Sequence, residues 1–225
     1  MDEASKTNQL RGADFAPCYL QGRVLDIGAG KDAVCAWAEV FDQQHGDANH
    51  IGDYFPAQSF DAVHSSHCLE HMHDPVQALA GWWSLVKTGG YLILVVPDED
   101  LYEQGIWPSF FNADHKATFR LDRATSWSPV SHELRSLCES LPDAEIISAE
   151  VHSQGYDQAL NFLGRRDPLR IGYPKKWWLK LAKKIPLVGA DWRAAMLRRW
   201  VPLGYPMDQT HGAALAQIQI ILRRK

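Results

Sequence analysis

The chain has 225 residues, 46% of them hydrophobic, and a formal net charge of -4. This length suffices for one well-buried α/β core, so we expect a single domain over residues 1–225. The negative charge argues against nucleic acid as an obligatory partner. No stretch approaches the roughly 18 apolar residues of a membrane-spanning helix, and residues 1–10 are polar, which together predict a cytoplasmic protein.

The cysteines are scattered along the chain at Cys18, Cys35, Cys68 and Cys138. They show neither the close spacing of a zinc site nor the density of a disulfide framework. We therefore predict reduced, mostly structural thiols and no metal site.

The first third of the chain predicts a compressed βαβ unit. Residues 23–27 form a short apolar run that ends at Gly28 and Gly30, as in a buried strand that turns into a helix, here a short one near residues 31–36. A second strand is expected over residues 38–41. The polar residues 43–49 then stand where a full unit would have its long helix.

The middle of the chain predicts strand, helix and strand. Residues 60–64 are apolar, and Pro75 marks the start of a helix whose apolar side chains recur at helical spacing. Those side chains are Val76, Leu79, Trp82, Trp83 and Val86. Two glycines in residues 88–90 predict a tight turn, and residues 91–96 predict a fully buried strand closed by Pro97.

The last third adds a helix over residues 129–140, with Ser128 as its cap, and strands over residues 145–151 and 216–222. Alternating strands and helices are typical of a doubly wound parallel sheet. In such a sheet a ligand binds at the carboxyl ends of the strands, where the turns after residues 27, 41 and 64 converge.

Two carboxylates stand at these strand ends. Asp26 precedes the glycine turn and suits a ligand with an ammonium group, while Asp42 can accept hydrogen bonds from the two hydroxyls of a ribose. Gly28 and Gly30 let the backbone pass close to such a ligand. A glycine turn alone is no more than a turn, but together these residues fit an adenosyl amino acid.

Residues 24–30 (VLDIGAG) resemble the first motif of class I S-adenosylmethionine-dependent methyltransferases. Residues 59–71 resemble the fourth-strand signature of that family, residues 88–97 its turn and fifth strand, and residues 217–222 its last strand. The resemblance implies a Rossmann-like α/β sheet of seven strands with an antiparallel last strand, S-adenosylmethionine as cofactor, and methyl transfer as the activity.

The resemblance also implies cofactor-binding residues. Asp26, Gly28 and Gly30 would surround the methionine part, and Asp42 would hold the ribose. Further candidates are Asp47 and Ala48 at the adenine, with Asp53 as the alternative to Asp47, and Ser66 and His67 at the methionine end. His71 is interpreted as a structural histidine.

An alcohol acceptor needs a base, and the candidate catalytic residues are His115 and its neighbour Asp114, in a polar cluster after the fifth strand. The alternative is that these residues only stabilise a loop. Residues 97–119 resemble a bacterial methyltransferase subgroup associated with surface-glycan genes. This favours transfer to an oxygen of a small molecule or sugar, including a lipid-linked glycan.

Residues 157–212 form a predicted basic, Trp-rich helical insertion before the last strand. Residues 165–199 hold eleven Lys and Arg against two Asp, interleaved with tryptophans. Such segments form either a helical lid or a surface that contacts anionic membrane, here through residues 175–199 at the inner membrane face. No recognisable module favours nucleic acid.

Two other functions compete with methyl transfer. Residues 28–33 fit the GxGxxG/A pattern of nicotinamide-dependent oxidoreductases, but in that pattern the acid lies about 20 residues on, and Asp42 comes too early. The second alternative is a catalytically silent protein that keeps the fold as a binding module.

Overall fold

The computed structural model describes residues 3–163 and 206–225. Helices alternate with strands over most of this length. The strands are β1 (Val24–Ile27), β2 (Glu39–Phe41), β3 (Phe60–Ser66), β4 (Val86–Pro97), β5 (Thr118–Arg120), β6 (Ser131–Glu133), β7 (Ala144–His152) and β8 (Gln217–Arg224). The α-helices are α1 (Glu3–Asn8), α2 (Phe15–Tyr19), α3 (Pro75–Ser84) and α4 (Leu134–Glu139), and single turns of other helix types are η1 (Ala48–Asp53), η2 (Leu69–His71), η3 (Glu99–Glu103), η4 (Gln158–Leu160) and η7 (Gln209–His211).

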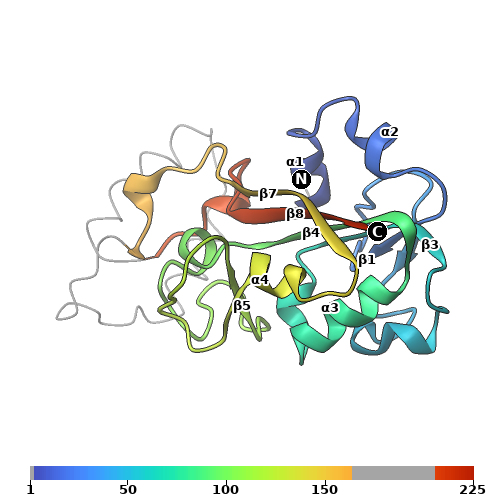
Figure 1. Cartoon of the computed structure of the whole chain (residues 1–225). Coiled ribbons are helices and arrows are strands. Elements are labelled where there is room, and N and C mark those ends of the chain that lie inside the picture. Colours follow the sequence, from blue (N-terminus) through green and yellow to red (C-terminus); the bar gives the residue numbers. More distant parts are fainter. Residues whose placement is uncertain (1–2, 164–205) are drawn as a thin grey trace.

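The central sheet has the strand order β2-β1-β3-β4-β8-β7 (Figure 1). β1 to β4 are parallel, and β8 runs antiparallel to both β4 and β7. The mixed α/β fold with an antiparallel last strand is thus confirmed. Within the described residues the sheet has six strands instead of the seven that the resemblance implies. Between β2 and β3 the chain forms the 3-10 segment η1, which Asp47 caps.

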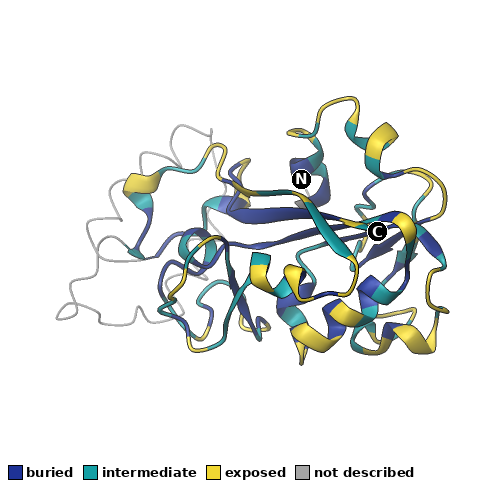
Figure 2. Cartoon of the chain, viewed as in Figure 1, coloured by how far each residue is buried: buried dark blue, intermediate teal, exposed yellow. Residues whose placement is uncertain are grey.

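Helices cover both faces of this sheet, α1 and α2 on one side and α3 and α4 on the other (Figure 1). The α3 side holds the larger core, in which Trp82 and Trp83 are fully buried. A smaller core of Leu20, Val24 and Ile93 lies under α2. The central strands β1, β3, β4 and β8 are therefore buried over most of their length, while the outer faces of the helices are exposed (Figure 2).

Two predicted helices are corrected. Residues 31–36 form turns, because the Asp26 carboxylate accepts the backbone N–H of Val34 at 2.6 Å and so holds the chain away from helical geometry. The helix expected over residues 129–140 is confined to α4, and its cap is the Glu133 side chain instead of Ser128. The residues before it pair with β5 as strand β6.

Both long strands contain register shifts. β4 begins at Val86, earlier than predicted, and its pairing with β3 shifts where the glycines lie. A Cβ on Gly90 would meet the Asp61 carbonyl oxygen at 2.6 Å, so the strand needs a glycine there. β7 is an edge strand with β8 as its one sheet neighbour in the described chain, and it has a bulge between Ile146 and Ser148.

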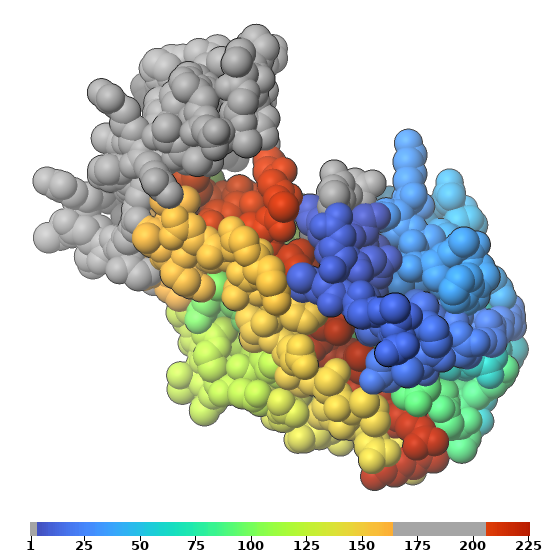
Figure 3. Space-filling model, turned by 90° about the horizontal axis from the view of Figure 1, so that it is seen from above, coloured from blue at the N-terminus to red at the C-terminus, as the bar shows by residue number. Residues whose placement is uncertain are grey.

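The predicted basic segment 165–199 lies outside the described residues. The flanks of the insertion meet, since Asp157 N–H donates to Gln209 Oε1 at 2.8 Å and Gln209 Nε2 donates to the Asp157 carbonyl at 3.0 Å. Beside this junction Lys6 of α1 donates to the Thr210 carbonyl at 2.5 Å. Seen from above, the N-terminal segment from residue 3 onward lies against this part of the C-terminal segment (Figure 3). Among the helices described, none has the length and apolar character to cross a membrane.

Candidate active site

Asp26 at the end of β1 organises the turn that follows. Its side chain is 1% exposed, and it contacts His64 Nδ1 at 2.7 Å and the N–H of Val34 at 2.6 Å. Burial lowers the pKa of His64 despite the carboxylate beside it, so the ring is neutral and Nδ1–H donates to Asp26. Asp26 thereby fixes the direction in which the chain leaves the strand.

The glycine turn brings the backbone close to η2. Gly28 has a φ of +78°, and a Cβ added there would lie 2.7 Å from both Cβ and Sγ of Cys68. Gly30 also has a positive φ, +58°, and its Cβ position lies 4.0 Å from Asp42 Oδ2. Only glycine therefore fits at position 28 without displacing Cys68.

The largest of three adjoining cavities opens at the carboxyl ends of β1, β2 and β3 and has a volume of about 630 Å³. It is lined by five of the predicted cofactor residues: Gly28, Asp42, Asp47, Ala48 and His67. Asp53 does not line it and stands exposed at the end of η1. The structure thus brings the predicted nucleoside-binding residues together and leaves the alternative residue outside.

The wall formed by η1 is held in place by side chains. Asp47 Oδ1 accepts the backbone N–H of Asn49 at 2.9 Å and its side-chain amide at 2.7 Å, and these bonds lower the pKa of Asp47. The Ala48 carbonyl accepts the indole N–H of Trp82 at 2.8 Å. The position of η1 therefore depends on α3.

A second cavity, of about 210 Å³, lies under the glycine turn and is lined by Asp26, Gly28, Ser66, His67 and residues of the N-terminal segment. The Ser66 hydroxyl is buried and has no hydrogen-bond partner within residues 3–163 and 206–225. His67, with a φ of +51°, follows β3 and lines this cavity as well as the first. An unpartnered hydroxyl that faces a cavity indicates a polar ligand.

The third cavity, of about 420 Å³, adjoins the first through His67 and His71 and also contains Glu70, Tyr102 and His115. His115 is buried, and its Nδ1 lies 2.6 Å from Glu103 Oε1. The ring of Tyr102 stacks on it with centroids 5.3 Å apart. Burial acts to lower the pKa of His115, but the bond to Glu103 and the charges of Glu70, Glu103 and Asp114 outweigh it and raise that pKa.

Residues 4–156 match a protein family described as "Methyltransferase domain". The chain belongs to this methyltransferase family. Its cofactor is S-adenosylmethionine. No curated protein matches the sequence.

Two solved structures are similar to this chain over almost its whole length. YcgJ from Bacillus subtilis superposes with a TM-score of 0.51 at 14% identity, covering 99% of this chain and 100% of that one. A SAM-dependent methyltransferase from Archaeoglobus fulgidus gives a TM-score of 0.49 at 16% identity, covering 98% and 93%. At these identities the likeness to YcgJ shows the fold alone.

The first two cavities of the methyltransferase suit S-adenosylmethionine by their chemistry. Gly28 lines both cavities with its backbone, Ser66 offers an unsatisfied hydroxyl, and Asp42 in the first cavity offers a carboxylate. The described residues therefore supply a close backbone approach, a hydroxyl and an acceptor for ribose hydroxyls, as an adenosyl amino acid requires.

The two predicted catalytic residues, His115 and Asp114, line different cavities. Asp114 pairs with His71 at 2.9 Å and with Lys116 at 3.2 Å, not with His115, and it lines the first cavity instead of the third. The hydrogen bond from Lys116 lowers the pKa of Asp114. His71, interpreted from sequence as structural, lines two cavities.

Sequence reasoning missed Glu70 and Tyr102 as cavity residues and Glu103 as the hydrogen-bond partner of His115. Glu70 precedes His71 within the fourth-strand signature, so its position in that motif could have indicated a role at the site. No such signal exists for Glu103, which is placed by the single π-helical turn η3 and by Gln104 with a φ of +53°.

Proposed function

We propose that this methyltransferase moves the methyl group of S-adenosylmethionine to a hydroxyl oxygen of a small polar acceptor bound in the third cavity. The supporting observation is that this cavity, with its buried imidazole, shares His67 and His71 with the cofactor side. A nucleophile beside His115 is thus next to the place where the transferable methyl group is expected.

On the cofactor side, Asp26, Gly28, Gly30, Ser66 and His67 would hold the methionine part and Asp42 the ribose. Asp47 and Ala48 would flank the adenine. S-Adenosylmethionine supplies a methyl carbon that is already electrophilic. The chain's contribution is therefore to align the reactants and to exclude water, without covalent help.

On the acceptor side, His115 is the residue proposed to meet the hydroxyl. Glu103 accepts a hydrogen bond from Nδ1–H, which leaves the lone pair on Nε2. In a metal-free site Nε2 can take the proton that the hydroxyl loses as its oxygen is methylated. The stacked ring of Tyr102 keeps the imidazole in this orientation.

The polar lining of the cavity supports a hydroxyl-rich acceptor. Asn112, Asp208 and Thr210 contribute amide, carboxylate and hydroxyl groups beside the histidines. Sugars, including those of surface glycans and lipid-linked glycans, carry many hydroxyls that such groups can orient by hydrogen bonds. This acceptor class is a proposal from the lining and from the resemblance of residues 97–119.

A methyl-transfer assay with labelled S-adenosylmethionine and a panel of sugars tests the proposal. His115→Ala should lower turnover at least about 100-fold, the scale of a lost acid or base, while the Kd for S-adenosylhomocysteine stays near the wild-type value. His132→Gln is the control, because His132 lines none of the three cavities.

Unchanged turnover in His115→Ala would show that His115 only stabilises the loop. Absence of transfer to every acceptor with cofactor binding intact would favour the silent binding module. Calorimetry with a nicotinamide dinucleotide addresses the oxidoreductase alternative, for which binding of that cofactor is required.

A further inference from the structure

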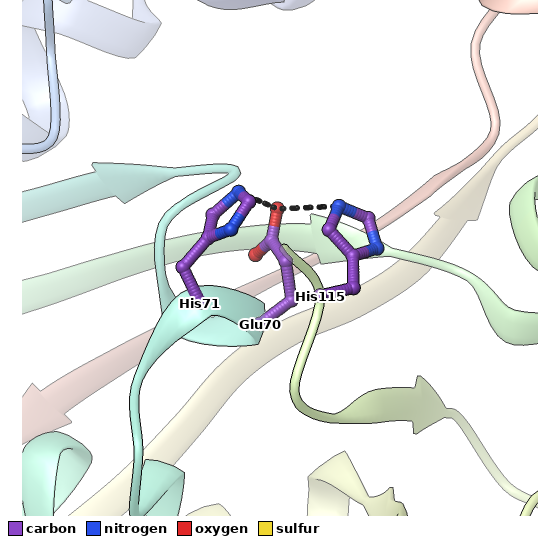
Figure 4. Close-up of side chains that lie close together, drawn as sticks. All are labelled: Glu70, His71 and His115. Carbon is purple, nitrogen blue, oxygen red and sulfur yellow. Dashed lines mark ion pairs between the residues drawn. The ribbon is translucent and has the colours of Figure 1, made fainter. Parts of the chain in front are cut away.

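Three side chains able to ligate metal meet at the third cavity: Glu70, His71 and His115. Their ligand atoms lie within 4.8 Å of one another. Glu70 Oε1 is 3.8 Å from His71 Nε2 and 3.9 Å from His115 Nε2, and Figure 4 shows the carboxylate between the two rings. Both separations are too long for a hydrogen bond, so neither ring satisfies the carboxylate.

Each ring is held on its far side by a different carboxylate. His71 Nδ1 lies 2.9 Å from Asp114 Oδ2, and His115 Nδ1 lies 2.6 Å from Glu103 Oε1. Because an ionised carboxylate only accepts, each Nδ1 carries the hydrogen, and in the neutral ring the lone pair is on Nε2. The two Nε2 atoms are the ones turned toward Glu70, so three electron-pair donors face a common point.

Glu70 gives an independent indication that something occupies this point. Its side chain is 1% exposed, and neither carboxylate oxygen has a hydrogen-bond partner in the described part of the chain. Burying a carboxylate without a hydrogen-bond partner is costly, and proteins normally offset that cost by pairing the charge or by binding a metal.

We propose that Glu70, His71 and His115 bind one divalent transition-metal ion of the Zn²⁺ type. Two imidazoles and one carboxylate are a donor set that zinc accepts, with a further position left open. Asp114 and Glu103 complete the site as outer carboxylates that orient the two rings. The ligand atoms need to contract by less than about 1 Å to reach zinc bond lengths near 2.1 Å.

The open position of the ion faces the third cavity, where the acceptor is proposed to bind, so the ion can take part in methyl transfer. This link rests on the proposed function, whereas the ion site itself does not. With the ion in place, His115 Nε2 is a ligand and cannot take a proton. An acceptor hydroxyl bound at the open position has a lowered pKa instead, and it releases its proton to solvent before its oxygen is methylated.

The site is tested by equilibrium dialysis of the chelator-stripped full chain against Zn²⁺, without methyl donor or acceptor, followed by metal analysis. The wild type should bind one Zn²⁺ per chain. Glu70→Gln and His71→Ala should each weaken that binding at least tenfold, and Glu103→Gln should weaken it by about 10- to 100-fold through loss of ring orientation. His211→Gln is the matched control, since that exposed histidine borders the same cavity beside a carboxylate, Asp208.

The melting temperature of the metal-free protein separates this role from a purely structural one. Glu70→Gln removes a buried charge that no hydrogen bond satisfies within the described residues, so the metal-free variant should melt at or above the wild-type temperature. A lower melting temperature combined with unchanged Zn²⁺ affinity would overturn the proposal, as would a wild type that binds no stoichiometric Zn²⁺. Because neither measurement involves methyl transfer, a failed transfer assay would not affect them.

Discussion

Gly28 is the single residue on which the shape of the cofactor side depends most directly. Its φ of +78° is disfavoured for any residue with a side chain, and the space beside it is already filled by Cys68. The backbone conformation and the close approach therefore both require glycine, for independent reasons.

Gly28→Ala should lower the free energy of unfolding by about 1 to 3 kcal/mol, the sum of the backbone penalty and the displacement of Cys68. The same displacement should weaken S-adenosylhomocysteine binding in calorimetry. Gly12→Ala is the control, because its added Cβ meets nothing within 4 Å. Equal affinities for the two variants would contradict the assignment of Gly28 to the cofactor wall.

Asp98 has a buried carboxyl group whose titration makes the stability of the fold depend on pH. Its Oδ1 accepts the N–H groups of Asp100 and Leu101, both at 3.0 Å, and burial raises its pKa to about 6. In the unfolded chain the pKa is 3.8. Between these values the folded protein holds a proton that the unfolded chain has lost, so this group's contribution to stability is full below about pH 4 and disappears as the pH rises through 6.

Asp98→Asn keeps the accepting oxygen and removes the titration. Urea unfolding at pH 4, 5, 6 and 7 should therefore show a flatter profile for the variant than for the wild type, with the difference confined to this interval. Asp122→Asn should retain the wild-type slope there, because Arg135 lowers the pKa of Asp122 and moves its titration below the interval. Parallel profiles for wild type and Asp98→Asn would exclude this account.

At the scale of elements, α3 holds η1, which lines the first cavity, through one indole. Trp82 and Trp83 are both buried, but Trp82 Nε1 donates to the Ala48 carbonyl in η1 and Trp83 Nε1 donates to the Pro142 carbonyl, each at 2.8 Å. The two neighbouring tryptophans therefore connect α3 to two different segments of the chain. Only the segment bound by Trp82 lines the first cavity.

Trp82→Phe and Trp83→Phe form a matched pair. Each removes one hydrogen bond and part of a buried ring, so we expect each to lower the unfolding free energy by about 1 to 3 kcal/mol. Only Trp82→Phe should also raise the Kd for S-adenosylhomocysteine, because only it releases Ala48. A similar change in Kd for both variants would indicate general loosening and not a specific tie to η1.

The elements that could be predicted from sequence are those buried on both faces. The strands predicted over residues 23–27, 91–96 and 216–222 correspond to β1, β4 and β8, since short, largely apolar segments favour buried strands. The helices predicted over residues 31–36 and 129–133 are wrong, because Asp26 accepts the N–H of Val34 and β6 pairs with β5. Both competing interactions are tertiary and leave no local pattern.

The candidate site also contains residues that the sequence predicts and an interaction that it does not predict. Asp26, Gly28, Gly30 and Asp42 occupy strand ends, so the spacing of the strands places them in advance. The pairing of His115 with Glu103 depends on how one π-helical turn closes, and the sequence suggested the adjacent Asp114 instead. The partner of His115 in the fold is therefore Glu103, twelve residues earlier in the chain, and not its sequence neighbour Asp114.

At the scale of the whole molecule, the basic segment 165–199 gives the chain a strong charge asymmetry. If residues 175–199 contact anionic membrane, the protein should co-sediment with vesicles that contain phosphatidylserine, and added salt should release it. Neutral vesicles are the control. No sedimentation at low salt would favour the alternative of a lid over the domain.

The edges of the sheet also matter for how this protein behaves at high concentration. β7 is nine residues long and exposes Ile147 and Val151, features that invite pairing with the edge of another sheet. The bulge between Ile146 and Ser148 bends the strand, and Glu145 and Glu150 add negative charge along it. The irregular register of β7 therefore acts as a built-in defence against aggregation.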